Sequence, residues 1–353
     1  SGWRSLHVRR RSQGVCNGGR GKGLPSLSAN QPAAPESAVM ELADLAERII
    51  DNVERVIVGK RTSTLLLLSA YLAGQHVLLQ DLPGTGKTTL VKALARSCGA
   101  TYARIQFTPD LLPSDITGIS ILDPSQQDFR FKKGPIFHQL LLADEINRAT
   151  PKVQSALLEA MEERQVTVDG ISHPLPTPFT VLATQNPLEY EGTYPLPEAQ
   201  LDRFSICLSL GYPSEAEETM LLQRTGAQPL QGLRQVTDME QILRAQQTVQ
   251  QIHVSHALQR YIVSLTQATR RHPALRLGAS PRASLSLMQL GQALAGIMGR
   301  EYVIPDDIKM LAPYVLRHRI ILTPEASWDG RSTVQIVKEI LDNTPVPVGD
   351  AWA

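Results

Sequence analysis

Short apolar runs alternate with helical patterns through the first half of the chain. Five runs have the length and composition of buried strands, at residues 76–80, 101–107, 138–145, 179–187 and 204–213. A helical pattern at 87–99 follows the first of these runs. Strands that alternate with helices are typical of an α/β fold built on a mainly parallel sheet. We therefore predict an α/β core with a parallel sheet.

Two insertions interrupt this alternation. Residues 116–136 alternate in polarity around an Asp-Pro pair, and residues 164–175 alternate around Asp169-Gly170. An Asp-Gly pair between alternating segments is a strong hairpin signal, because both turn positions favour a positive φ. Each insertion is expected to form a β-hairpin.

After Pro213 the strand patterns stop and helical periodicity takes over. Five segments carry it, and several have Ser, Asp or Pro where a helix cap or first turn belongs. We predict four parts: a disordered basic leader at 1–39, an α/β core at 40–212, a helical domain at 213–323, and a C-terminal helix with a tail at 324–353.

The leader at residues 1–39 is rich in Gly, Ser, Arg and Pro and shows no periodicity. Such composition is typical of disorder, and its arginines also fit an organellar transit peptide. A third interpretation, which we prefer, is translated sequence upstream of the true start, because Met40 directly precedes an amphipathic helical pattern.

Charge and cysteine content narrow the class of protein. The formal net charge is +1, and residues 1–39 carry six basic side chains and one acidic side chain, which leaves the remaining chain at −4. A mildly acidic body argues against a nucleic-acid motor. The three cysteines show no disulfide or metal-ligand spacing, and no apolar run is long enough to span a bilayer. We expect a cytoplasmic protein without a membrane span.

A glycine-rich loop lies between the first strand and the helix that follows it, with the residues Pro83, Gly84, Thr85, Gly86, Lys87, Thr88 and Thr89. Glycines let backbone N–H groups turn toward phosphate oxygens, and a helix N-terminus adds partial positive charge. Lys87 is expected to neutralise nucleotide phosphates and Thr88 to ligate Mg²⁺. The Walker A consensus has glycine where this chain has Asp81. The alternative is a glycine-rich turn before an ordinary helix.

Polar side chains end two further strands. Asp144 and Glu145 follow four apolar residues, and ligands bind at the carboxyl edge of such sheets. Asp144 is a candidate Mg²⁺ ligand of the Walker B type, and Glu145 is a candidate general base for an attacking water. Asn186 is a candidate to hold that water or to contact the γ-phosphate. The alternatives are an acidic pair that faces solvent and a turn-forming Asn-Pro.

These motifs together resemble the MoxR family of AAA+ ATPases. The resemblance covers about residues 41–322 and is carried by LLQDLPGTGKTTL, LLLADEINRATPKVQSALLEAMEE, FTVLATQNPLEYEGTYPLPEAQLDRF, GASPRASL and VIPDDIKMLAPYVLRHRI. It implies a P-loop AAA+ three-layer core with a parallel sheet and hairpin insertions, followed by an all-α lid domain. Acidic residues at the position of Asp81 are familiar in that family.

The resemblance also implies roles for residues outside the loop. Arg203 in LDRF matches the arginine finger, which reaches the γ-phosphate of a neighbouring subunit; the alternative is a salt bridge with Asp202 or Glu198. Arg282 matches the sensor arginine that moves the lid onto the nucleotide. Gly59 belongs to a segment that resembles the lining of the adenine pocket. The resemblance also implies assembly into a ring, in which hairpins near the central pore are expected to contact a client protein.

We therefore expect an Mg²⁺-dependent ATPase that assembles into a ring, with a hexamer as the expected size. Its ATP hydrolysis is expected to remodel or mature client proteins in a chaperone-like role, and the resemblance implies clients that include von Willebrand factor A-domain proteins. The alternatives are a metal-insertion motor like that of magnesium chelatase, a nucleic-acid motor, and a nucleotide switch that does not hydrolyse. An intact Glu145 argues against the switch.

Overall fold

Helix α1 (Glu36–Glu54) opens the described part of the chain. The computed structural model describes residues 35–82, 84–123, 128–186, 192–223, 230 and 232–347. The leader was predicted to extend to residue 39, but residues 36–39 belong to helix α1. Val39 is buried as part of the apolar face of this helix, which explains the difference. The leader at 1–34 and Pro83 lie outside the described residues.

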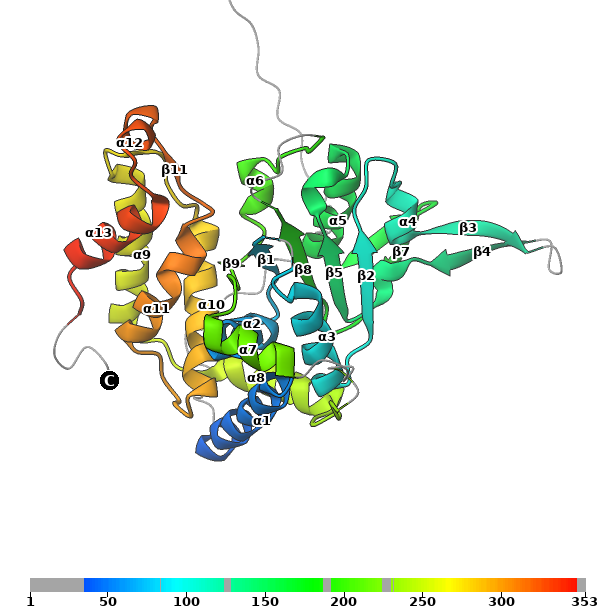
Figure 1. Cartoon of the computed structure of the whole chain (residues 1–353), viewed down its shortest axis with the longest axis horizontal. Helices are drawn as coiled ribbons and strands as arrows, with labels where there is room; N and C mark the ends of the chain where they lie inside the picture. Colours follow the sequence, from blue (N-terminus) through cyan, green and yellow to red (C-terminus); the bar gives the residue numbers. More distant parts are fainter. Residues whose placement is uncertain are drawn as a thin grey trace, which may run out of the picture. The chain divides into compact units, whose positions relative to one another are not determined.

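A parallel sheet forms the centre of the first half of the chain (Figure 1). Across the sheet its strands follow the order β2 (Tyr102–Gln106), β5 (Leu140–Asp144), β8 (Thr180–Gln185), β1 (Val77–Gln80) and β9 (Ile206–Leu208), and every neighbouring pair is parallel. All five predicted strands are confirmed. Since β5, β8 and β1 are neighbours, their carboxyl ends meet at one edge of the sheet.

Alternation along the strands divides the core into two hydrophobic clusters. Val77 and Leu79 belong to one cluster and Leu78 to the other, because successive strand residues face opposite sides of a sheet. The first cluster includes residues of α1, α2 (Arg61–Leu72) and α3 (Lys87–Cys98), and the second includes residues of α5 (Pro151–Glu163). Helices therefore cover both faces, as the three-layer prediction requires.

Both predicted hairpins are present. β3 (Gly118–Asp123) pairs antiparallel with β4 (Asp128–Lys133), and β6 (Gln165–Val168) pairs antiparallel with β7 (Ile171–Pro174). Asp169 and Gly170 have φ values of 51° and 77°, the positive pair that a two-residue hairpin turn needs. Figure 1 shows β3 and β4 extending away from the central sheet. Shorter elements of this half are α4 (Pro113–Thr117), α6 (Glu198–Leu201) and the 3₁₀ turns Pro135–Phe137 and Ile146–Arg148.

Helices dominate the second half of the chain, as predicted. They are α7 (Glu215–Gln223), α8 (Met239–Gln251), α9 (His256–Arg271), α10 (Pro281–Ile297), α11 (Pro305–Leu316), α12 (Pro324–Trp328) and α13 (Thr333–Asn343). Asp238, Ser255 and Ser280 each cap a helix by accepting a hydrogen bond from a backbone N–H of its first turn. α10 packs against α8, α9 and α11, and Figure 1 shows α9, α10 and α11 next to one another.

One feature of this half differs from the prediction. β10 (Leu275–Leu277) and β11 (Ile321–Leu322) form an antiparallel pair, so the expectation that strands stop after residue 213 is wrong for these segments. They are too short to show an alternation in the sequence. Helix α13, which lies in the part predicted as a C-terminal helix with a tail, packs against α9 and α11. Within the described ranges, no helix combines the length and the apolar character needed to cross a membrane.

Candidate nucleotide-binding site

A cavity of about 410 Å³ opens where β1, β5 and β8 end and α3 begins. It brings together the predicted residues from Gly84 to Thr89 with the polar ends of three strands; its lining is Asp81, Gly84, Thr85, Gly86, Lys87, Thr88, Thr89, Arg104, Asp144, Glu145, Thr184, Gln185 and Asn186. Arg203, Arg282 and Gly59 do not line this cavity.

The glycine-rich loop has the backbone that phosphate binding needs. Gly84 and Gly86 have φ values of 81° and 86°, and no atom lies within 4 Å of a Cβ built at either. The left-handed backbone, rather than crowding, is therefore the reason for glycine here. Helix α3 begins at Lys87, so the partial positive charge of its N-terminus lies at the cavity. Lys87 Nζ donates to the carbonyl oxygens of Asp81 and Leu82 at 3.1 and 2.6 Å.

Asp81, which departs from the consensus, has a structural task. It is only 5% exposed, and its Oδ2 accepts the backbone N–H groups of Leu210 and Gly211 at 2.7 and 3.1 Å. Its Oδ1 accepts the N–H of Leu82 at 3.0 Å. The carboxylate thus ties the start of the loop to the chain that leaves β9. This role was not predicted from the sequence. The one signal for it was the presence of Asp81 where the Walker A consensus has glycine.

Asp144, at the end of β5, has a partner on each neighbouring strand. The Thr184 hydroxyl on β8 donates to Oδ1 at 2.5 Å. Arg104 on β2 donates to Oδ2 from Nη2 at 2.6 Å and from Nε at 3.0 Å. The acid is 9% exposed, and these donors compensate for its removal from water. Neither Thr184 nor Arg104 was predicted, because their contacts depend on the order of the strands.

Glu145 has a left-handed backbone, with φ of 57°. Such a conformation costs about 1–3 kcal/mol in a residue other than glycine and is found at functional sites. The Glu145 N–H donates to the Thr184 hydroxyl at 2.8 Å, so Thr184 contacts both acidic residues. Oε2 of Glu145 accepts hydrogen bonds from Gln106 at 2.8 Å and Arg148 at 3.0 Å. The strand break therefore aims the carboxylate into the cavity.

The oxygen donors of the cavity fit Mg²⁺. The Thr88 hydroxyl and the Asp144 carboxylate line the same space, and Mg²⁺ prefers such hard oxygen ligands. The described part of the chain holds no group of three or more His, Cys, Asp or Glu side chains that could bind a metal. Mg²⁺ at a nucleotide takes one or two protein ligands and completes its shell with phosphates and water. Thr88 and Asp144 therefore fit the protein's share of such a shell.

The two predicted arginines meet at a different place. Arg203, before β9, and Arg282, in the first turn of α10, line a second cavity of about 220 Å³. Arg203 Nη2 lies 2.8 Å from Oε2 of Glu162 on α5, and Arg282 Nη2 pairs with Oε1 of the same carboxylate. The alternative prediction of an Asp202 or Glu198 partner for Arg203 is wrong, since the carboxylate is that of Glu162. Arg282 lies beside Arg203 instead of at the glycine-rich loop.

Asp202, next to Arg203, accepts hydrogen bonds from the helical domain. Its Oδ1 accepts from Nε of the buried Arg319 at 2.8 Å, and its Oδ2 accepts from the Ser280 hydroxyl at 2.7 Å. Burial lowers the pKa of Arg319, and the hydrogen bond and charge of Asp202 oppose that shift. Arg319 also donates to the carbonyl oxygens of Phe204 and Ser205. The segment that carries Arg203 is thus fastened to the helical domain.

Gly59, predicted near the adenine, packs against α7. Its φ is 72°, and a Cβ at this position would overlap the Glu217 carboxylate. Lys60 Nζ, in the next residue, donates to the carbonyl oxygen of Tyr212 at 3.1 Å. The segment is therefore joined to the chain that connects β9 with α7.

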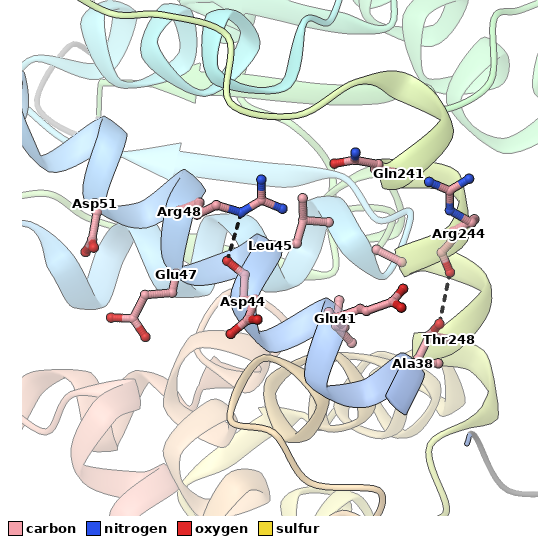
Figure 2. A pocket seen from close by; sticks show the side chains of 12 residues that line it. Ala38, Glu41, Asp44, Leu45, Glu47, Arg48, Asp51, Gln241, Arg244 and Thr248 are labelled. Atoms are coloured by element: carbon pink, nitrogen blue, oxygen red, sulfur yellow. Dashed lines mark hydrogen bonds between the residues drawn. The ribbon is translucent and has the colours of Figure 1, made fainter. Parts of the chain in front are cut away.

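A larger cavity of about 500 Å³ lies between α1 and α8. Figure 2 shows Glu41, Asp44 and Glu47 on the α1 side and Arg244 on the α8 side. Arg61 forms salt bridges with Glu47 and with Asp51, which also lines the cavity. The lining contains no glycine loop, and its acidic side chains would repel phosphate. The cavity at the sheet edge is therefore the nucleotide candidate.

Each half of the chain matches a model of a known protein family. Residues 76–206 match the family model described as ATPase family associated with various cellular activities (AAA). Residues 267–340 match the AAA lid domain. The lid match passes residue 323, so the prediction that the resemblance ends near residue 322 is wrong.

Whole-chain relatives extend this result. The protein YeaC of Bacillus subtilis (strain 168) is 52% identical over 309 residues, which are 87% of this chain and 97% of that protein. Chaperone MoxR1 of Mycobacterium tuberculosis is 44% identical over 325 residues, which are 90% of this chain and 86% of that protein. A crystal structure of a candidate ATPase from Cytophaga hutchinsonii has a TM-score of 0.83 at 39% identity and covers 89% of this chain and 98% of that one.

The parallel sheet, the phosphate-type loop and the helical lid define an AAA+ ATPase. The chain belongs to the MoxR family of these ATPases, which confirms the family predicted from its motifs. Nucleotide binding and ATP hydrolysis are general properties of that class.

Proposed function

We propose that this chain hydrolyses ATP with Mg²⁺ at a site that a neighbouring copy completes, and that the cycle remodels or matures client proteins. The observation that carries the proposal is a separation: Lys87 and Glu145 line one cavity, whereas Arg203 lies in another. One copy therefore offers the phosphate loop and the acidic pair. We assign the additional positive charge to Arg203 of the adjoining copy.

Five side chains of the cavity have a proposed task. The loop N–H groups and Lys87 hold the β- and γ-phosphates, and Asn186 orients the attacking water or contacts the γ-phosphate. Thr88 and Asp144 hold Mg²⁺, which when bound withdraws charge from the phosphate oxygens. Glu145 accepts a proton from the water as its oxygen bonds to the γ-phosphorus. The bond from that phosphorus to the β–γ bridging oxygen breaks, and ADP leaves.

The contacts of Glu145 add a condition to this step. Gln106 and Arg148 both donate to Oε2. These two donors occupy the lone pairs of Oε2, so this oxygen can take a proton from the water only after one of them leaves. Proton transfer to Oε2 therefore requires Glu145 to leave at least one of these partners when nucleotide binds.

Arg203 and Arg282 act together in this proposal. Both pair with Glu162, so a neighbouring nucleotide that reaches one guanidinium also lies close to the other. A planar guanidinium suits the charge spread over the transferring phosphoryl group, and an arginine finger accelerates such reactions about 10³–10⁵-fold. Sites shared between successive copies favour a closed ring, for which we propose six copies.

The biological setting is proposed from the family. The relative from Mycobacterium tuberculosis is named a chaperone, which supports client proteins as the object of the cycle. The resemblance supports clients with von Willebrand factor A domains. Cys98 and Cys207, the cysteines within the described residues, are buried free thiols, which supports a reducing compartment such as the cytoplasm.

Mixed assemblies test the shared site. Glu145→Gln should bind a fluorescent ATP analogue like the parent but lose turnover by about 10²-fold or more, because the base is gone. Arg203→Ala, assayed by itself, should also lose turnover. When the two variants are mixed and reassembled, copies with Glu145 adjoin copies with Arg203, so turnover should return. A mixture as inactive as its components would overturn the shared site.

Three measurements on the parent protein separate the remaining alternatives. A nucleotide switch would bind the analogue but show no turnover in the parent. A nucleic-acid motor would be stimulated by DNA at moderate salt. A metal-insertion motor would retain a porphyrin-bound partner in a pull-down.

A further inference from the structure

Glu162 contacts both arginines that we assign to the shared site. It lies in the last turn of α5, and each of its two carboxylate oxygens has its own guanidinium. Oε2 lies 2.8 Å from Arg203 Nη2, and Oε1 pairs with Arg282 Nη2. One residue of the core therefore joins an arginine of the core to an arginine of the lid. Nothing in the local sequence around Glu162 predicts this.

Two guanidiniums that share one carboxylate are close enough to repel each other. Asp202, the other acid that lines this cavity, already accepts hydrogen bonds from Arg319 and from the Ser280 hydroxyl. The uncharged amides of Gln75 and Gln289 line the same cavity. Burial lowers the pKa of His76 to about 3, so this ring adds no positive charge at neutral pH. Glu162 is thus the counter-charge that offsets the repulsion.

A second link fixes the arginines relative to each other. Ser280 caps α10, two residues before Arg282, and its hydroxyl donates to Asp202 Oδ2 at 2.7 Å. Asp202 directly precedes Arg203 in the chain. The backbones of both arginines are thereby joined, while Glu162 aligns their side chains. Each guanidinium has five N–H donors, so each keeps donors for a phosphate after binding Glu162.

We propose that Glu162 is a positioning residue, which holds Arg203 and Arg282 together as one cationic pair for the γ-phosphate of the neighbouring copy. This inference rests on the proposed function. A pair that is already aligned requires no rearrangement when the phosphate arrives, whereas two arginines without a counter-charge would move apart. Glu162 does not line the nucleotide cavity of its own copy. Because the charge on the transferring phosphoryl group develops in the transition state, an aligned pair acts on the rate more than on the binding of ATP.

The test is Glu162→Gln in the full-length protein, with Glu163→Gln as the matched control. Glu163 is the next residue of α5, is exposed, and has no ion pair within the described residues. We expect Glu162→Gln to lower kcat about tenfold or more without changing the KM for ATP or the melting temperature, because the arginine pair acts on the transition state. Glu163→Gln should match the parent, and Glu162→Asp should recover part of the loss.

The background of Arg282→Ala separates positioning from a structural role. Without Arg282 there is no pair to align, so Glu162→Gln should cost much less in single-turnover rate than it costs in the parent. An equal loss in both backgrounds, an unchanged kcat, or a raised kcat would each overturn the proposal. Arg203→Ala distinguishes failure of the shared site from failure of the role of Glu162. If it turns over like the parent, the shared site fails; if it is inactive while Glu162→Gln is normal, only the role of Glu162 fails.

Discussion

Arg104 and Asp144 form a two-donor ion pair across neighbouring strands of the sheet. Nη2 and Nε of Arg104 lie 2.6 and 3.0 Å from the same oxygen, Oδ2 of Asp144. The parallel register of β2 and β5 places Gln106 opposite Asp144, and Arg104 stands two residues earlier on the same face of β2. A cation of the protein therefore lies on the carboxylate that we propose as a Mg²⁺ ligand.

This pair predicts how the site responds to Mg²⁺. In Arg104→Gln the Asp144 carboxylate loses its competing cation, so less Mg²⁺ should be needed to bind ATP. The Arg104 side chain is 45% exposed, so solvent weakens the pair, and we expect the half-saturating Mg²⁺ concentration to fall about two- to fivefold. Titration of Mg²⁺ against binding of a fluorescent ATP analogue measures it. Arg61→Gln, which removes an exposed arginine with acidic partners on α1, is the control; a higher Mg²⁺ requirement in Arg104→Gln would show that Arg104 supports the metal.

Restoring the consensus glycine at position 81 should destabilise the protein. Asp81→Gly removes the acceptor for the N–H groups of Leu210, which is buried, and of Gly211, which is half-buried. A buried donor that is left unsatisfied in this way lowers the free energy of unfolding by about 1–3 kcal/mol. Urea unfolding at pH 7 measures the loss. Asp81→Asn keeps one acceptor oxygen and should lose less. Equal stability of Asp81→Gly and the parent would refute the structural role.

The sequence predicted features whose signal is local. The five strands, the Asp169-Gly170 turn and the glycine-rich loop each depend on residues that are adjacent in the chain, and the structure has all of them. Asp144 and Glu145 were predicted because an acidic pair at the end of a buried strand lies at the edge where ligands bind.

The remaining features depend on contacts between distant segments. Arg104 and Thr184 reach Asp144 only because β5 lies between β2 and β8 in the sheet. Glu162 meets Arg203 and Arg282 across separations of 41 and 120 residues in the chain. No local pattern specifies such partners, since they follow from the packing of helices and strands around the finished sheet. For the same reason the partner predicted for Arg203 was wrong.

Acid should destabilise the fold through buried histidines. Burial, with a smaller effect of the nearby Arg164 charge, lowers the pKa of His76 from 6.5 to about 3, and burial also lowers the pKa of His318. Between pH 6.5 and 3 the unfolded chain therefore binds more protons than the folded one, so stability is lost as the pH falls through this window. Each such histidine contributes up to about 1.4 kcal/mol per pH unit.

A substitution assigns part of this acid sensitivity to His76. His76 Nδ1 accepts the N–H of Val181, and Nε2 lies 3.3 Å from the carbonyl oxygen of Met161. A glutamine amide can make both kinds of hydrogen bond but takes up no proton. The free energy of unfolding of His76→Gln should therefore change less between pH 7 and pH 5 than that of the parent. His256→Gln, which replaces an exposed ring, serves as the control; identical pH slopes for His76→Gln and the parent would contradict the assignment.

The β3–β4 hairpin should depend on Phe131 and not on its neighbour Phe129. The Phe131 ring stacks on His173 of β7 with ring centroids 4.1 Å apart, and it meets Phe137 edge-on at 5.6 Å. Phe129 is 71% exposed. Each aromatic pair contributes about 0.5–1.5 kcal/mol beyond its buried area. Phe131→Ala should therefore loosen the hairpin, and hydrogen exchange of the amides of β3, β4 and β7 should become faster.

Phe129→Ala is the matched control for this prediction, because it removes the same ring from the same strand without removing a ring contact. Its amide exchange should match that of the parent. Phe131 joins the two hairpins, so faster exchange should reach β7 as well as β3 and β4, while the strands of the central sheet stay protected. Faster exchange in both variants would show that exposed apolar area, and not the stack on His173, stabilises the hairpin. Unchanged exchange in Phe131→Ala would show that the backbone pairing of β3 and β4 suffices alone.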